Sequence, residues 1–485
     1  MYALLTSTLL MLVALTAGQE RPPQPLPVEG KLEFPPYEMR TLANGLRVVV
    51  VPHHEQPAIT ARLLVQAGAA MDPPKKPGVA SLMGVLLDQG TGKRSAQQIA
   101  DTIDSVGGLL DTGASTDLSF AQVLVMKDSF DDALDLVADV ALNPAFSPEE
   151  IERQRSQLLS ALKVNYQDPE YVADSTIDRL VYGFHPYGIP AEGTPESLAA
   201  ITRDDLIQFH RRWFVPNNAL LAIVGDVTAE EAFKGAERVF GNWRRGDVPM
   251  LQVTDPPPPA RRVVVVDRSN AVQTEIRVGQ IGIARKHPDY MSLRLAINVL
   301  GGEGANRLHN VLRSERGLTY GASADMDALK RGGDIIADTD TRSETTGEAL
   351  RVVIDQLWRL QREPVSRREL EGAQDYLTGS FPLTIESPDQ IALQVLNTLF
   401  HDLDVEELET FRDRVDAVTV QDVQRVAREF LQPDRLSIVL VGDASKIAPQ
   451  LESIGIDQFE QIALADLDLT TADFLRPAAG TPAAR

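Results

Sequence analysis

Hydrophobic and polar positions repeat in two segments of the chain that start 217 residues apart, at Ala200 and at Ala417. The first segment is AITRDDLIQFHRRWFVPNNALLAIVGDV and the second is AVTVQDVQRVAREFLQPDRLSIVLVGDA. Each predicts a threonine N-cap, an amphipathic helix, a turn that contains proline, a buried apolar strand and a Gly-Asp turn. A match of this length without a gap indicates an internal repeat.

Earlier stretches of the two halves correspond as well. LRVVVVP near residue 50 matches RRVVVVD near residue 265, and both patterns predict a short buried strand. An apolar strand and a helical run come next, in which Gly68 pairs with Gly282 and Val85 with Val299 at a spacing of 214. We therefore expect the same order of elements in both halves.

The repeat predicts two similar domains, over 34–252 and 263–460, joined by a stiff proline-rich linker over 253–262. Each domain mixes strands with long helices, so we expect an α+β fold with antiparallel hairpins and meanders packed under helices. The leader 19–33 and the tail 461–485 contain clusters of proline and alanine. We expect both to be disordered.

The N-terminus carries a short apolar stretch, from about Leu4 to Leu15, followed by small residues. This pattern predicts a secretory signal peptide over 1–18, with cleavage near Ala17 or Gly18. A single membrane anchor is the alternative, but a span needs about 20 apolar residues. The sequence thus predicts an exported protein, periplasmic or extracellular.

Composition and charge narrow the chemistry that the chain can perform. Its 485 residues include no cysteine, which excludes disulfides, thiolate-bound zinc and a cysteine nucleophile. Seven histidines and the carboxylates are the metal-binding side chains that remain. A net charge of −22 argues against nucleic acid or an anionic membrane surface as the main partner.

Three landmarks carry a resemblance to a known family. They are TLANGLRVVVVPHHEQPAITARLLVQAGAAMDPPKKPGVA in the first half, WFVPNNALLAIVGDV near its end, and LGGEGANRLHNVLRSERGLTYGASA in the second half. Together with the tandem halves, they are similar to the pitrilysin or insulinase family of zinc peptidases, over essentially the whole mature chain. The resemblance implies two tandem pitrilysin-like α/β-sandwich domains.

In active members of this family the first helix carries His-x-x-Glu-His. Histidines at i and i+4 lie on one helix face and bind one zinc, while the Glu between them activates a water molecule. In this chain Ser81 and Val85 stand at the histidine positions and Gly84 at the general-base position. The third ligand, a Glu of a later helix, falls at Ala161 or Leu162. The resemblance therefore implies no metal site and no cofactor in this chain, which we expect to be inactive alone.

A different part of the family's machinery is present in the second half. Arg313 and Tyr320, in LRSERGLTY, match the Arg/Tyr pair that the family places opposite the zinc, where it binds the scissile carbonyl and stabilises the oxyanion. We expect Arg313 to end a helix that Gly317 breaks, and Tyr320 to begin the next strand, so that both side chains reach one cleft. The alternative is structural: Arg313 pairs with a surface carboxylate while Tyr320 packs in the sheet.

A glycine-rich stretch precedes this pair. GGEGANR, with Gly301, Gly302 and Gly304, is similar to a longer loop that the non-catalytic subunit of related processing peptidases uses on substrate. The resemblance implies a substrate-binding role for these glycines. A phosphate-binding loop is disfavoured, because the stretch lacks the Gly-Lys-Ser/Thr ending and has no basic surroundings.

Two other stretches of the sequence offer side chains with metal-binding or catalytic chemistry. His53, His54 and Glu55 follow a strand, along which adjacent side chains point to opposite sides, so a solvent-facing turn is favoured over a metal site. Ser81 lacks the Gly-x-Ser-x-Gly frame and an identifiable base, which argues against a hydrolytic nucleophile.

Three functions follow as hypotheses. The first is an exported subunit that pairs as a heterodimer with a zinc-bearing sister chain, encloses a peptide chamber and supplies Arg313 and Tyr320 to the sister's site. Peptide would bind by adding a strand to a sheet edge. The second is a structural or assembly protein, as in the core proteins of respiratory complexes. The third, an autonomous hydrolase with a relocated metal site, has no side-chain constellation to support it, and the retained pair favours the first.

Overall fold

The structure is a computed structural model that describes residues 34–302 and 306–476. The predicted signal peptide and leader, Gly304 and the last nine residues of the predicted tail lie outside the described residues. No helix within the described ranges is long and apolar enough to cross a membrane.

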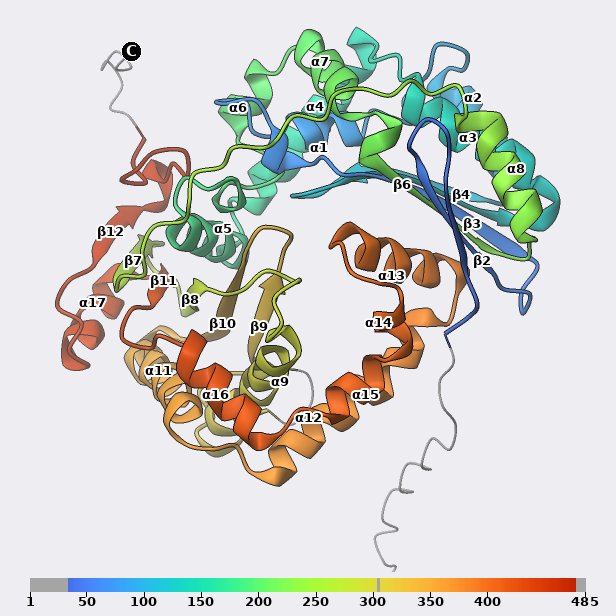
Figure 1. The fold of residues 1–485 in the computed structure, drawn as a ribbon. Helices are drawn as coiled ribbons and strands as arrows, with labels where there is room; N and C mark the ends of the chain where they lie inside the picture. Colours follow the sequence, from blue (N-terminus) through green and yellow to red (C-terminus); the bar gives the residue numbers. More distant parts are fainter. Residues whose placement is uncertain (1–33, 303–305, 477–485) are drawn as a thin grey trace, which may run out of the picture. The chain divides into compact units, whose positions relative to one another are not determined.

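Two mixed sheets of six strands each organise the described residues (Figure 1). The first sheet has the order β1 (Glu38–Thr41), β2 (Arg47–Pro52), β6 (Ala219–Gly225), β3 (Ala58–Val65), β5 (Ser119–Met126) and β4 (Leu109–Ala114). The second has the order β12 (Glu460–Ala463), β7 (Arg262–Asp267), β11 (Ser437–Gly442), β8 (Gln273–Ile281), β10 (Gly333–Arg342) and β9 (Ala322–Ala328). Strands β2 to β6 and β7 to β11 therefore occupy matching places, as the repeat predicts.

The register of the strands repeats as closely as their order. Val49 of β2 lies opposite Ala222 of β6, and Val264 of β7 lies opposite Val439 of β11. Both of these pairings are parallel, as is the pairing of β12 with β7, so each sheet holds parallel pairs beside the antiparallel pairs that the sequence predicts. A hairpin forces an antiparallel pair, whereas the long helical excursion before β6 or β11 lets the strand return in either direction.

Helices cover both sheets. The first half contains α1 (Val79–Gly84), α2 (Ala96–Ser105), α3 (Phe130–Leu142), α4 (Pro148–Asn165), α5 (Pro169–Tyr182), α6 (Pro195–Ala200), α7 (Arg203–Trp213) and α8 (Ala229–Phe240). The second half contains α9 (Tyr290–Gly301), α10 (Arg307–His309), α11 (Thr346–Arg362), α12 (Arg367–Ser380), α13 (Pro388–Phe400), α14 (Glu406–Glu409), α15 (Phe411–Asp416), α16 (Val420–Phe430) and α17 (Ala444–Ser453).

The predicted helix starts in the repeated segment are confirmed. The Thr202 hydroxyl accepts from the Asp205 backbone N–H at 3.3 Å, and the Thr419 hydroxyl accepts from the Asp422 backbone N–H at 3.2 Å. In both cases the aspartate carboxylate accepts a hydrogen bond from the threonine backbone N–H, which completes a capping box.

One helix of each half packs against the sheet of the other half (Figure 1). Helix α5 of the first half packs against β8 and β11 of the second sheet, and α13 of the second half packs against β3 and β6 of the first. Every residue of β6 and of β11 is consequently buried. This burial on both faces explains why these strands are apolar without alternation.

The prediction of a disordered tail from residue 461 is wrong as far as Arg476. Strand β12 pairs with β7, and Phe474 is only 1% exposed. The Arg179 guanidinium of α5 also donates to the carbonyls of Leu469 at 2.8 Å and Thr471 at 3.1 Å. A few apolar side chains spaced along a polar stretch thus anchor it, although its composition alone suggests disorder. The predicted linker 253–262 has no regular structure before β7 begins at Arg262.

Candidate functional site

Helix α1 contains the positions at which the family's zinc motif belongs. It starts at Gly78, whose φ of +97° is in the left-handed region that glycine tolerates. The Asp72 carboxylate accepts from the backbone N–H groups of Gly78 at 2.6 Å and Ala80 at 2.8 Å, so it caps the helix from outside. Burial raises the pKa of Asp72 to about 7, against the lowering effect of these hydrogen bonds.

Gly84 seals this helix against the sheet. A Cβ at Gly84 would lie 2.6 Å from the carbonyl carbon of Gly113 and 2.7 Å from the nitrogen of Ala114, both in the backbone of β4. Such distances leave no room for any side chain, and least of all for a glutamate. At the general-base position, the space that a glutamate side chain would need is therefore filled by the backbone of β4.

The other three positions offer no ligand set. The helix ends at Gly84 rather than running on, and half-buried Val85 is its C-cap. Ser81 is half-buried, and Ala161 is exposed on α4 beside the buried Leu162. A hydroxyl, a methyl group and an isopropyl group cannot hold zinc, so the residues present do not fit the metal of the family.

His53 and His54 also lie apart from any metal-binding cluster. The Nδ1–H of His54 donates to the Asp226 carboxylate at 2.6 Å, whereas the His53 side chain lies largely buried with Nε2 at 3.8 Å from Glu55. The predicted solvent-facing turn thus holds for His54 only, since the two rings point in different directions. Within residues 34–302 and 306–476, no group of three or more histidines and carboxylates has the arrangement of a metal site.

The Arg313 segment has an unusual helical geometry. Residues Asn310–Glu315 form a π-helix directly after α10, and Gly317 follows with φ of +61°. Short π-helical stretches are rare and occur often at functional sites. The prediction that Arg313 ends a helix and Gly317 breaks it is therefore met by a π-helix instead of an α-helix.

Arg313 is exposed, and its side chain forms no hydrogen bond or ion pair with another residue in the described ranges. Tyr320 is 83% exposed and lies two residues before β9. Neither side chain takes the structural alternative of a surface ion pair or a place in the sheet.

The backbone that carries the pair is anchored on both sides. The Leu318 N–H donates to the Leu312 carbonyl at 2.8 Å, and both leucine side chains are buried in the core. Upstream, the Arg307 guanidinium binds Glu369 of α12 through Nε at 2.6 Å and Nη2 at 3.2 Å. Burial opposes ionisation of Glu369, but its hydrogen bonds with Arg307 and Ser366 lower the pKa of this carboxyl to about 2.

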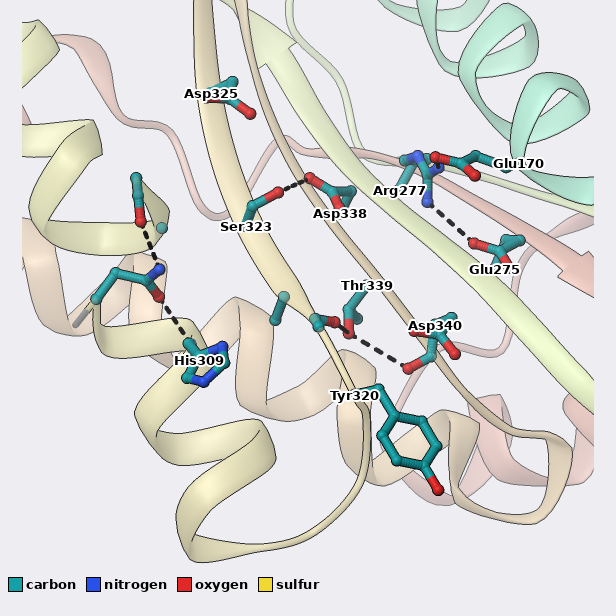
Figure 2. Close-up of a pocket in the computed structure, with 15 residues that line it drawn as sticks. Glu170, Glu275, Arg277, His309, Tyr320, Ser323, Asp325, Asp338, Thr339 and Asp340 are labelled. Carbon is teal, nitrogen blue, oxygen red and sulfur yellow. Dashed lines mark hydrogen bonds and ion pairs between the residues drawn. The ribbon is translucent and has the colours of Figure 1, made fainter. Parts of the chain in front are cut away.

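A cavity of about 530 Å³ opens beside Tyr320 on the face of the second sheet that α5 covers (Figure 2). Figure 2 shows Tyr320 next to Asp340 and Thr339, with its hydroxyl directed away from the other labelled side chains. Arg313 is not among the residues that line this cavity. The acidic residues of its lining come from three strands and from α5: Glu170, Glu275, Asp325, Asp338 and Asp340.

Arg277 is the single arginine among the residues that line the cavity. Its guanidinium lies 2.5 Å from Asp174, 3.4 Å from Glu275 and 4.0 Å from Glu170. Burial raises the pKa of Glu275 to about 7, although Arg277 acts in the opposite direction. The carboxylates outnumber the arginine, so the cavity presents a negative potential that favours cationic groups.

Gly301 and Gly302 line the same cavity. A Cβ at Gly301 would lie 2.1 Å from the Ala324 nitrogen, and the Gly302 carbonyl accepts from the Asn306 side chain at 2.5 Å. Gly301 lets the end of α9 approach the backbone of β9, whereas a Cβ at Gly302 would lie 2.2 Å from the side-chain nitrogen of Asn298. Both glycines therefore have a packing reason to be glycine, in addition to the substrate-binding role that the resemblance implies.

Sequence reasoning missed the acidic lining of the cavity. Asp338 and Asp340 are two residues apart in β10, and so are Asp325 and Asp327 in β9. Alternate residues of a strand point to one face, so this Asp-x-Asp spacing was the available signal. Glu170 could not be found in this way, because it comes from the other half of the chain.

Comparison with known families identifies the chain. The family described as "Insulinase (Peptidase family M16)" matches residues 47–195, and "Peptidase M16 inactive domain" matches residues 200–377. The chain belongs to peptidase family M16. The first M16 match contains the sealed α1 region, and the second contains Arg313 and Tyr320.

Other M16-like proteins match over nearly their whole length. An uncharacterised zinc protease of Bacillus subtilis is 22% identical over 396 residues, which is 81% of this chain and 95% of the relative. The crystal structure of a peptidase M16 inactive domain from Pseudomonas fluorescens is 28% identical, with a TM-score of 0.79, and the match covers 84% of this chain and 98% of that one. The predicted pitrilysin-like fold of two tandem domains is thereby confirmed.

A third similarity concerns the fold alone. A chain of complex III2 from Candida albicans has a TM-score of 0.72 at 15% identity, covering 84% of this M16 chain and 97% of that one.

Proposed function

We propose that this chain is an exported M16 subunit that lacks a zinc site and works as a heterodimer with a zinc-bearing sister chain. The pair would enclose a chamber that degrades or processes peptides. This chain would bind substrate and supply Arg313 and Tyr320 to the active site of its partner. The inactive-domain match over residues 200–377 supports the division of labour.

The observation that carries this proposal is the state of Arg313 and Tyr320. Both side chains are exposed and have no polar partner among the residues that the structure describes, on a backbone anchored by Leu312 and Leu318. An exposed, unpartnered side chain contributes little to folding stability. A rigid backbone that presents two free donors is instead what binding of an external group requires.

The two side chains suit one chemical step. A guanidinium and a phenol can both donate hydrogen bonds to the carbonyl oxygen of a scissile peptide bond. As negative charge develops on that oxygen, these donors stabilise it without reorganising. The metal that activates water would belong to the sister chain, because Ser81, Gly84, Val85 and Ala161 cannot bind it.

A peptide would reach the pair along β9. This strand ends the strand order of the second sheet, and its first residue, Ala322, follows Tyr320 by two positions. An extended peptide added to the edge of β9 would run past Tyr320 and the acidic cavity.

A structural or assembly role is the second candidate. The fold that this chain shares with a chain of complex III2, together with the sealed α1 region, favours it. It gives no reason for Arg313 and Tyr320 to be unpartnered.

The first experiment separates both candidates from an autonomous enzyme. The chain is purified alone, its zinc content is measured, and a mixed peptide library is tested for cleavage. We expect neither stoichiometric zinc nor efficient cleavage. Zinc at one equivalent with robust cleavage would overturn both candidates.

The second experiment adds a family member that carries the zinc motif, ideally one encoded beside this chain. We expect a stable complex that cleaves peptides, and slower cleavage with Arg313→Ala or Tyr320→Phe. Arg316→Ala and Tyr376→Phe are matched controls, because Arg316 lies on the same segment but pairs with Glu348 at 3.1 Å, and Tyr376 lies on α12. A complex that forms but never cleaves would favour the structural role.

A further inference from the structure

We propose that two buried threonines of β10, Thr339 and Thr341, are positioning residues that fix Tyr320 for its contact with substrate. The inference rests on the proposed function of Tyr320. Both threonines are almost fully buried, at 2% and 1% exposure, and neither belongs to the Arg/Tyr pair.

Thr341 holds the residue at the start of the Tyr320 loop. Its hydroxyl donates to the Leu318 carbonyl at 2.7 Å, in a buried environment. The Thr345 hydroxyl lies 2.8 Å from the same oxygen of Thr341 and can donate to it. The Leu318 N–H is bound to the Leu312 carbonyl, so both polar backbone groups of Leu318 are fixed.

Thr339 holds the residue just after Tyr320. Its hydroxyl donates to the Gly321 carbonyl at 2.8 Å. The Gly321 N–H donates to the Thr319 hydroxyl at 3.0 Å, and this hydroxyl lies 2.7 Å from the Gly321 carbonyl and 3.0 Å from the Asp340 carboxylate. A hydroxyl has one proton, so Thr319 donates to one of these two acceptors at a time.

The result is a short loop whose backbone is bound before and after Tyr320. The tyrosine side chain is 83% exposed and has no polar partner in the part of the chain that the structure describes. Figure 2 shows Thr339 and Asp340 directly beside Tyr320. These hydrogen bonds hold the backbone on both sides of Tyr320. They restrict the directions in which the Tyr320 side chain can leave the sheet, which lowers the entropy lost on binding.

Hydrogen exchange on the chain alone tests whether the threonines hold the loop. In Thr339→Val and Thr341→Val, we expect the amides of residues 318–321 to exchange about tenfold faster. Thr346→Val is the matched control: this buried threonine of the same half donates to Thr274 at 2.9 Å and does not touch the loop. Unchanged exchange in both loop variants would overturn the inference.

Kinetics of the complex with the zinc-motif chain test whether the restraint matters for the reaction. With the best-cleaved peptide of the library, we expect the Val variants to lower kcat about tenfold with KM within about twofold, because misplacement affects the transition state more than binding. Thr339→Ser and Thr341→Ser keep the hydroxyl and should restore kcat. Thr346→Val should leave kcat unchanged.

The outcomes separate this inference from the proposed function. If Tyr320→Phe slows the complex while both Val variants retain the kcat of the unmodified chain, the positioning role is wrong and the proposed function stands. If neither Tyr320→Phe nor Arg313→Ala slows it, the proposed function is wrong, and the positioning role falls with it. Slow Val variants that Ser rescues support both.

Discussion

The α1 region of the first half and the Arg313–Tyr320 segment of the second half differ in whether their side-chain positions are packed or open to solvent. At α1, Gly84 presses against the backbone of β4, so the place of a catalytic side chain is filled. At the second segment, the backbone is equally well anchored, but Arg313 and Tyr320 extend into solvent. One region has become part of the core, and the other keeps two donors that the fold itself does not need.

Close packing of a glycine on an edge strand occurs in both halves, but it has a different consequence in each. A glycine places the first α-helix of each half directly on an edge strand: Gly84 on β4 and Gly301 on β9. In the first half the glycine stands where the family has its general base, so close packing and catalysis exclude each other there. In the second half Gly301 lies outside the Arg/Tyr pair, and close packing leaves the pair free.

The largest effect is expected from restoring the lost base. Gly84→Glu would place a Cβ 2.6 Å from the Gly113 carbonyl carbon and bury a carboxylate without a partner. We expect a loss of at least about 3 kcal/mol in the free energy of unfolding, or failure to fold. Urea unfolding measures it, with Gly92→Glu as control, because a Cβ at Gly92 has no neighbour within 4 Å. A stable Gly84→Glu protein would show that α1 is not sealed.

The second prediction addresses Tyr320 in the Arg313–Tyr320 segment. In the complex with the zinc-motif chain, Tyr320→Phe removes one donor to the developing oxyanion, and we expect kcat/KM to fall about 100-fold. The free energy of unfolding should stay within about 0.5 kcal/mol, because the ring is 83% exposed. Peptide cleavage and urea unfolding are measured on the same preparation. A loss of stability that accounts for the lost activity would make Tyr320 a structural residue after all.

The third prediction tests the core that the halves share through α5. The Tyr182 hydroxyl donates to Asp334 of β10 at 2.8 Å, and Asp178 of α5 lies close by. Burial and the neighbouring carboxylates raise the pKa of Asp178 to about 8, and burial raises that of Asp334 to about 7. Raised values mean that the folded state holds protons that the unfolded chain releases near pH 4, so stability falls as pH increases.

This loss should run from about pH 4 to about pH 8, at no more than about 1.4 kcal/mol per pH unit for each carboxyl. Asp178→Asn and Asp334→Asn should each flatten the profile of unfolding free energy against pH. Asp132→Asn, an exposed residue of α3, serves as control. A profile that rises from pH 4 to pH 8 would mean that these carboxyls are ionised in the folded protein.

The smallest effect compares the two copies of the repeated segment. Thr202→Ala and Thr419→Ala each remove an N-cap, and we expect each to cost about 1 kcal/mol. Thermal unfolding of the two variants measures this directly, with Thr→Ser at each position as the conservative control. Clearly unequal costs would show that the copies no longer contribute alike to one shared core.

Much of the fold could be predicted from the sequence because it rests on local patterns. Threonine caps, helical periodicity and apolar strands recur at a fixed spacing, and the structure confirms the caps and the order of elements that they imply. The prediction for the tail failed because it rested on clusters of proline and alanine, whereas the few residues that anchor the stretch up to Arg476, such as Phe474, act through distant partners.

For the candidate site too, some properties follow from the sequence and others only from the tertiary structure. The sequence by itself determined that Ser81, Gly84, Val85 and Ala161 cannot bind zinc, since ligand chemistry depends only on which side chain stands at each position. Only the tertiary structure decided that the space is closed, because this requires β4 to meet α1. It also decided that Thr339 and Thr341 bind the Tyr320 loop and that α5 and α13 cross between the halves. These are contacts between residues far apart in the chain, and no local pattern specifies them.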